Sequence, residues 1–337
     1  MKAGSSTGTF AIGNFSARRG SKASGSLKAG ELHDGSVVEI HFMIIRGVND
    51  GPTLLVTAGI SGVGLSSIEA ARRVLLKTDP RKLSGTLIVV PIVNEPAFLM
   101  RERSNVLENY EAPIYLFGIF PGSASGSLTE RMADIFTKEV IFKAQYFIDL
   151  HNAVKGGRYE PFVSIYPGLV SEEMREKAVE IAKSFGTRFI NDAGLRGPPS
   201  PKLAGRPEVI ANSKGIISFM SQCGEEGKLE EVDVEHQVQG VTNVMKFLRM
   251  IEGQPELPRE QLISSETIQV KSGKGGFLHL TVHLGERVKK GQLMAEITNS
   301  FYELIERIEA PADGYVTRIS TTPTVCSGDR IGHLSIV

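Results

Sequence analysis

The sequence predicts an α/β fold, with a largely parallel, mixed central sheet covered by helices and a small all-β barrel or sandwich at the carboxyl end. Three observations support this prediction. Continuous apolar runs of strand length, at residues 52–59, 87–93 and 146–150, are typical of strands buried on both faces. Apolar residues at helical spacing lie between them, as in residues 66–76. Beyond residue 258, glycines interrupt short alternating strands about every ten residues.

The other elements justify the same class in chain order. A strand at residues 37–45, before the first buried run, and an amphipathic helix at residues 128–143 extend the alternation of strand and helix. The later elements alternate in the same way: strands at residues 162–166 and 216–223, and helices at residues 172–185 and 232–251. Strand, helix and strand in this order predict parallel neighbours connected by crossover helices.

Three segments are expected along the chain. Residues 1–30 are rich in Gly, Ser and Ala and predict a loosely ordered lead-in or one edge strand. Residues 31–253 form the α/β domain, and residues 259–337 form the β domain. Phrases in this last segment resemble the half-repeats of a lipoyl or biotinyl carrier barrel. The expected hairpin tip at residues 299–302 has no acceptor lysine, so we expect a barrel-sandwich hybrid used for packing.

Composition restricts the partners and the compartment. Lys+Arg and Asp+Glu both number 38, so no net charge attracts nucleic acid or an anionic membrane. The two cysteines, Cys223 and Cys326, lie far apart, which argues against a disulfide framework and fits a reducing compartment. No apolar stretch approaches the ~20 residues of a membrane span. We therefore expect a cytoplasmic protein with neither nucleic-acid nor membrane partners.

The most informative local feature is the end of the run at residues 146–151. Asp149 and His151 are two residues apart on one strand, so their side chains project from the same face. Ligands of α/β sheets bind beyond the carboxyl ends of strands, where His151 lies. Asp149 could orient the imidazole, an arrangement that suits either a pocket residue or a hydrogen-bonded histidine at a strand end.

Much of the chain resembles the succinylglutamate desuccinylase/aspartoacylase family, which has a zinc carboxypeptidase-like fold. The matching segments are residues 52–74, 89–98, 120–123, 126–132, 144–151 and 214–229 and the carboxyl-terminal domain. The resemblance implies a zinc-dependent hydrolase of an acylated amino acid. It also implies zinc ligands at three positions, which here carry Ser61, Gly64 and His151. Serine is a poor zinc ligand and glycine has no side chain, so we expect neither zinc nor any other cofactor.

Two further family positions are also changed. The resemblance places an arginine that grips the substrate carboxylate at Gly118, and the general base at Gln222. An amide does not accept a proton near neutral pH, so the implied base is lost. Arg103 matches another arginine of the family pattern. The expected catalytic candidates in the pocket are His151, Ser61 and Gln222, and the expected substrate-binding residues are Arg103, Asn152, Tyr115 and Phe117.

These replacements lead to three functional hypotheses. The first is a non-catalytic homologue of the acylamino-acid deacylases, which binds a small molecule such as an acylated amino acid, or forms a homo- or hetero-oligomer with an active paralogue. The second is a metal-independent enzyme that acts on an amino-acid-like substrate through His151 with Ser61 or Glu225. Ser61 also fits a simple turn serine, because the Gly-x-Ser-x-Gly spacing is absent. The third is a zinc-dependent deacylase with substitute ligands.

Overall fold

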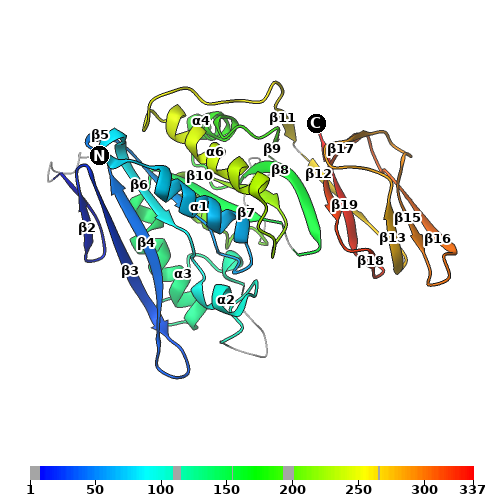
Figure 1. The fold of residues 1–337 in the computed structure, drawn as a ribbon, viewed down its shortest axis with the longest axis horizontal. Coiled ribbons are helices and arrows are strands. Elements are labelled where there is room, and N and C mark those ends of the chain that lie inside the picture. Colours follow the sequence, from blue (N-terminus) through cyan, green and yellow to red (C-terminus); the bar gives the residue numbers. More distant parts are fainter. Residues whose placement is uncertain (1–7, 109–114, 154, 193–200, 265) are drawn as a thin grey trace.

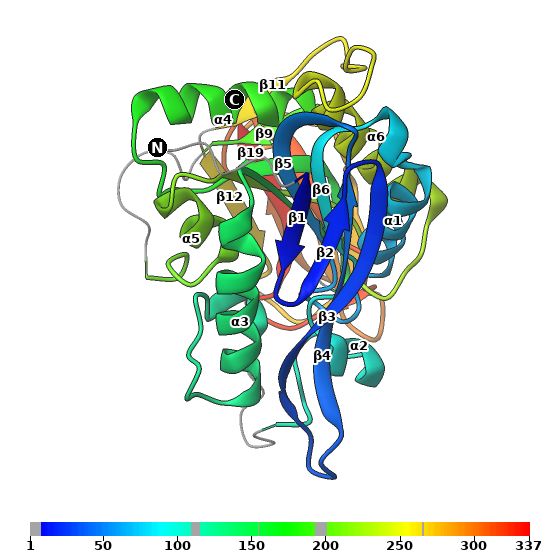
Figure 2. The same cartoon turned by 90° about the vertical axis from the view of Figure 1, so that its left-hand side faces the viewer.

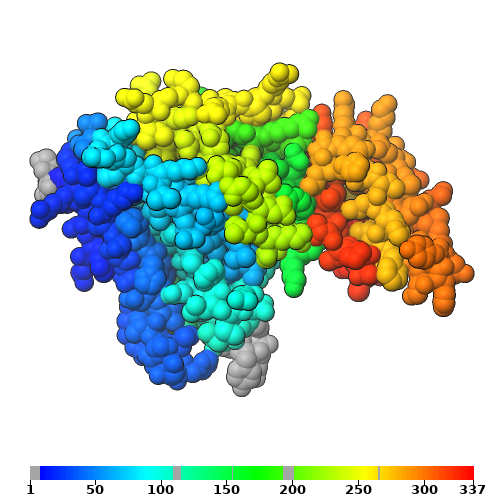
Figure 3. Space-filling view, in the orientation of Figure 1, coloured from blue at the N-terminus to red at the C-terminus, as the bar shows by residue number. Residues whose placement is uncertain are grey.

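The protein is described by a computed structural model that covers residues 8–108, 115–153, 155–192, 201–264 and 266–337. In the described part of the chain, a sheet of 13 strands runs through the elongated molecule. The amino-terminal strands lie at one end and the carboxyl-terminal strands at the other, as both the ribbon and the space-filling views show (Figures 1 and 3). The fold class expected from the sequence is confirmed.

The centre of the sheet is parallel and its flanks are antiparallel. The central strands are β6 (Ser84–Val90), β5 (Asn49–Thr57), β7 (Tyr146–Asn152) and β10 (Ile217–Gly224), each parallel to the next. Antiparallel strands extend this core on both sides: β4 (Val37–Arg46) and β3 (Ser21–Glu31) next to β6, and β8 (Gly157–Ile165) next to β10. The carboxyl ends of β7 and β10 therefore lie side by side.

Helices cover both faces of this sheet (Figure 2). One apolar core lies under α1 (Leu65–Lys77), α4 (Glu172–Ser184) and α6 (Glu231–Phe247). The opposite core lies under α3 (Leu128–Glu139) and α5 (Pro207–Ser213). The shorter helices are α2 (Glu95–Met100), η1 (Pro80–Lys82), η2 (Leu116–Gly118) and η3 (Ile141–Lys143). Within the described ranges no helix is long and apolar enough to span a membrane.

The alternation of side chains along β7 decides which face carries the polar pair. Ile148 and Leu150 belong to the core beneath α1, α4 and α6, whereas Phe147 belongs to the opposite core. Asp149 and His151 share the parity of Phe147, so they project toward α3 and α5. This is the pairing on one face that the sequence predicted.

The carboxyl-terminal region joins the large sheet. Strand β17 (Gly314–Ser320) pairs with β8, and β19 (Arg330–Ile336) and β12 (Glu266–Lys271) follow it outward. A separate four-stranded sheet consists of β16 (Leu304–Glu309), β15 (Leu293–Thr298), β13 (Gly276–Leu280) and β18 (Thr324–Val325). The short remaining strands are β1 (Thr9–Ile12), β2 (Phe15–Arg18), β9 (Phe189–Asn191), β11 (Leu262–Ser264) and β14 (Arg287–Val288). The large sheet thus crosses the boundary expected near residue 253.

Candidate functional site

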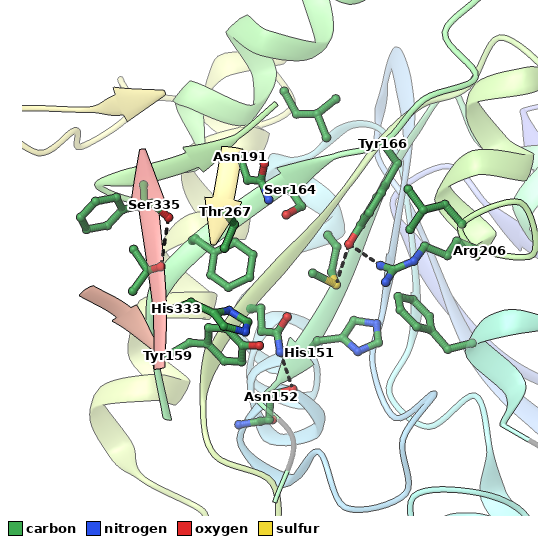
Figure 4. A pocket seen from close by; sticks show the side chains of 18 of the residues that line it. His151, Asn152, Tyr159, Ser164, Tyr166, Asn191, Arg206, Thr267, His333 and Ser335 are labelled. Carbon is green, nitrogen blue, oxygen red and sulfur yellow. Dashed lines mark hydrogen bonds between the residues drawn. The ribbon is translucent and has the colours of Figure 1, made fainter. Parts of the chain in front are cut away.

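A cavity of about 610 Å³ lies beyond the carboxyl ends of β7 and β10. Strands β8 and β9 contribute further walls, and β12, β17 and β19 of the carboxyl-terminal region close the opposite side. Figure 4 shows His333 and Ser335 on that side and Arg206 with Tyr166 across from them. The pocket is therefore built where the central sheet meets its carboxyl-terminal extension.

Six of the seven residues expected in the site line this one cavity. They are His151, Asn152, Gln222, Arg103, Tyr115 and Phe117. Ser61 is buried just outside the lining, and its hydroxyl donates a hydrogen bond to Oε1 of Glu226 at 2.7 Å. Since Glu226 itself lines the cavity, Ser61 is linked to the pocket through that carboxylate.

Asn152 lies beside two of the positions that the resemblance assigned to zinc binding and catalysis, Gly64 and Gln222. The Asn152 side-chain oxygen accepts bonds from the Ser67 backbone N–H at 3.0 Å and from the Ser67 hydroxyl at 2.6 Å. A Cβ atom at Gly64 would lie 3.6 Å from that same oxygen, so the Asn152 side chain reaches the space beside Gly64. The Gln222 amide donates to the Asn152 carbonyl at 3.2 Å.

His151 is held by a carboxylate that is itself fixed by the neighbouring strand. The His151 Nε2 atom lies 2.6 Å from Oδ2 of Asp149. Parallel pairing of β5 with β7 puts Thr57 beside Asp149, and the Thr57 hydroxyl donates to Oδ1 at 2.5 Å. Burial lowers the pKa of His151, but the charge and hydrogen bond of Asp149 and the charge of Glu208 raise that pKa above its ordinary value overall.

Glu208 adds a second buried carboxylate to this pair. It is the second residue of α5, and its side chain is fully buried. Neither of its carboxylate oxygens has a hydrogen-bond partner within the described part of the chain. Burial, and then the charge of Asp149, raise the pKa of Glu208 to about 7. Ligand atoms of Asp149, His151 and Glu208 all lie within 4.8 Å of one another.

These three residues overturn the expectation that no cofactor binds. One imidazole and two carboxylates are ordinary ligands of a divalent metal, and the unpartnered oxygens of Glu208 fit an ion at this position. The sequence-based expectation was wrong because it considered the positions of Ser61, Gly64 and His151 as the ligand set. Glu208 enters from another helix and could not be placed beside His151 without the fold.

Cations dominate the charged residues that line the pocket. Among the described lining residues, Arg103, Lys202, Arg206 and Arg330 are cationic and Glu226 is the carboxylate. The Arg206 guanidinium lies 4.4 Å from the centre of the Phe117 ring and 4.5 Å from that of Tyr166. It also donates a hydrogen bond to the Tyr166 hydroxyl. The pocket is suited to an anionic ligand.

Sequence reasoning missed Arg206 and Glu208, the two charged residues at the start of α5. The available signal was the phrase Arg206, Pro207, Glu208, because proline at the first helical position marks a helix start. That signal places the residues at the beginning of a helix, but it does not tell which strand end the helix faces.

Comparison with known proteins identifies the family. The sequence profile described as the succinylglutamate desuccinylase/aspartoacylase catalytic domain matches residues 50–248. The chain belongs to this family, which confirms the resemblance stated above and relates the chain to amide hydrolases.

Individual relatives agree with that assignment. The chain is 26% identical over 294 residues to the N-alpha-acetyl-L-2,4-diaminobutyric acid deacetylase of Halomonas elongata, covering 86% of this chain and 83% of the relative. It matches a succinylglutamate desuccinylase/aspartoacylase structure from Rhodobacter sphaeroides with a TM-score of 0.81 at 21% identity, covering 93% and 94% of the two chains. It matches the product-bound structure of the ectoine utilization protein EutE (DoeB) from Ruegeria pomeroyi with a TM-score of 0.82 at 21% identity, covering 94% of this chain and 95% of that chain. At these identities the two structures show the shared fold.

Proposed function

We propose that this protein binds a small acylated amino acid through its carboxylate, in a family pocket that lacks the usual general base. The observation that carries the proposal is the charge of the cavity, where four cationic side chains face a single carboxylate among the described lining residues. The deacetylase of Halomonas elongata is named for an acylated amino acid, which supports the same ligand class here.

Arg206 is the residue best prepared to receive the carboxylate. Its guanidinium is fixed between the rings of Phe117 and Tyr166, so little side-chain entropy remains to be lost when an anion binds. A planar guanidinium offers two parallel hydrogen bonds to a carboxylate. Arg206 would take the role that the resemblance assigned to the arginine missing at Gly118.

Gln222 supports altered chemistry at this site. A positioned general base contributes about 10²–10⁴-fold to a proton-transfer step, and an amide cannot supply that contribution. The Gln222 amide nitrogen also donates to the Asn152 carbonyl, which holds the side chain against the protein. We therefore expect binding of the acylated amino acid with hydrolysis that is slow or absent by the family route.

Calorimetry with Nα-acetyl-L-2,4-diaminobutyric acid tests the proposal. We expect binding by the wild type, at least about tenfold weaker binding by Arg206→Gln, and unchanged binding by Arg175→Gln, a matched change of an arginine on α4. The carboxamide of the same compound should bind weakly to the wild type. Equal affinity of the wild type for acid and carboxamide, or unchanged affinity in Arg206→Gln, would contradict the proposal.

A second candidate function is zinc-dependent amide hydrolysis with substitute ligands. The observation that favours it is the group formed by Asp149, His151 and Glu208 next to the pocket. The assay is acetate release from the same compound with zinc supplied, in the wild type and in Glu208→Gln. Release that depends on zinc and is lost in the variant would favour hydrolysis over binding alone.

A further inference from the structure

We infer that Asp149, His151 and Glu208 form a binding site for a divalent cation of the zinc type. This site would share only His151 with the zinc position implied by the family resemblance, because the other two ligand positions there carry Ser61 and Gly64. The inference goes beyond the binding of an acylated amino acid, and it supplies the metal on which the second candidate function rests. It can be tested without the organic ligand.

The charge of the group favours a bound cation. Asp149 and Glu208 are both fully buried, and their ligand atoms lie within 4.8 Å of each other. Two carboxylates in this arrangement cannot both be ionised unless a positive charge compensates them. The Arg206 guanidinium acts on Glu208 from nearby, but it is stacked on aromatic rings and donates to the Tyr166 hydroxyl. His151 adds a positive charge only when it is protonated. A further positive charge is needed, either a proton or a metal ion.

The two carboxylates differ in whether their oxygens have hydrogen-bond partners. Both oxygens of Asp149 have partners, Thr57 at Oδ1 and His151 at Oδ2. Neither oxygen of Glu208 has one among the residues that the structure describes. Buried polar side-chain atoms in native proteins rarely lack a partner. An ion bound between the three residues would supply the missing interaction.

Independent elements of the fold hold the three ligands in place. Parallel pairing with β5 fixes Asp149, and His151 follows it on the same face of β7. Helix α5 is anchored on β10, where the Ser218 hydroxyl donates to the Glu208 backbone carbonyl at 2.9 Å. Because His151 also lines the cavity, an ion can reach the group from the pocket.

The donor set selects the class of ion. One imidazole and two carboxylates carry a formal charge of about −2 when both acids are ionised and the histidine is neutral, which a divalent cation neutralises. Mixed nitrogen and oxygen donors suit Zn²⁺ and its transition-metal neighbours, whereas Mg²⁺ and Ca²⁺ prefer oxygen ligands alone. Zn²⁺ is therefore the probe of choice.

The test is a zinc titration of chelator-treated full-length protein, without any organic ligand, followed by calorimetry and thermal unfolding. We expect about one Zn²⁺ per chain and a higher Tm in the wild type, with at least about tenfold weaker binding in Glu208→Gln. Glu226→Gln is the matched control, since it removes a pocket carboxylate outside the group. That control should retain zinc binding.

Three results would overturn the inference. The first is that the wild type binds no stoichiometric zinc, and the second is that Glu208→Gln binds zinc as tightly as the wild type. The third is that Glu226→Gln loses zinc binding while Glu208→Gln retains it, which would place the ion beside Ser61. A readout on the unmodified chain covers the case in which Glu208→Gln fails to fold. Co²⁺ added to the wild type should give the visible absorption of a cobalt bound to imidazole and carboxylate, and a spectrum of hydrated Co²⁺ alone would also overturn the inference.

Discussion

Two positions of the family pattern, Ser61 and Gln222, and the buried group around His151 differ in how their polar side chains are hydrogen-bonded. Ser61 donates to Glu226 and Gln222 donates to the Asn152 carbonyl, so both use their hydrogen bonds within the protein. Glu208, by contrast, has two carboxylate oxygens without a partner in the described structure. Ser61 and Gln222 therefore use their hydrogen bonds within the fold, whereas the group around Glu208 has oxygens available for a ligand.

The largest effect is expected at Asp149, the residue that connects the two neighbouring strands. Asp149→Ala would leave the Thr57 hydroxyl and His151 Nε2 without their buried acceptor. We expect a loss of about 3 kcal/mol in the free energy of unfolding, because buried hydrogen bonds to a charged group are each worth about 1.5–3 kcal/mol. Urea unfolding measures this loss, with Asp50→Ala on the surface as the control. A loss equal to that of the control would show that the hydrogen bonds of Asp149 do not stabilise the fold.

Removal of the Glu208 carboxylate should increase the free energy of unfolding, in contrast to the loss expected at Asp149. In the metal-free protein Glu208→Leu should increase the free energy of unfolding by about 1–2 kcal/mol at pH 8, since it removes a buried carboxylate without a partner. The pKa of Glu208 is raised to about 7, so the native state binds more protons than the unfolded state between about pH 4.5 and 7. The contribution of Glu208 to stability therefore falls as pH rises through that range.

Denaturant unfolding of wild type and Glu208→Leu across this pH range measures the effect. The advantage of the variant should grow toward pH 8 and disappear near pH 4. A variant that is less stable than the metal-free wild type at pH 8 would show that Glu208 is a satisfied structural residue.

His333 is a second buried residue with an unpartnered side-chain atom, on the opposite side of the pocket. Its Nε2 atom also lacks a partner among the described residues, but burial and the charges of Arg318 and Arg330 lower its pKa to about 3. The native state then binds fewer protons than the unfolded state between about pH 6.5 and 3, so stability falls as pH falls through this range. The slope due to His333 is at most about 1.4 kcal/mol per pH unit. His333→Gln should flatten it in acid unfolding curves, whereas an unchanged slope would contradict the assigned neutral state.

The smallest effect is expected at Ser61. Ser61→Ala removes one hydrogen bond to Glu226, which should cost about 1 kcal/mol of unfolding free energy and leave zinc affinity within about twofold of the wild type. Thermal unfolding and the zinc titration measure the two quantities. A large loss of zinc affinity in Ser61→Ala would instead place the metal beside Ser61, one of the zinc positions implied by the family resemblance.

The local pairing of Asp149 and His151 was predictable because both residues lie on one strand, and the family resemblance predicted pocket residues on other elements, such as Gln222. Period-two alternation placed Asp149 and His151 on one face of a strand, and the apolar runs predicted the central strands. The docking of α5 beside β7, which brings Glu208 to His151, depends on packing between distant segments. The antiparallel pairing of β17 with β8 is equally distant in sequence, and it makes the carboxyl-terminal region a wall of the pocket. The cytoplasmic location and an oligomer with an active paralogue remain predictions.

Anomalous diffraction from crystals grown with Zn²⁺ would locate a metal ion bound by Asp149, His151 and Glu208. We expect one strong peak within coordination distance, about 2.0–2.2 Å, of a ring nitrogen of His151 and of oxygens of Asp149 and Glu208. A peak beside Ser61 and Glu226, or no peak near His151 at a saturating zinc concentration, would contradict the inferred metal site.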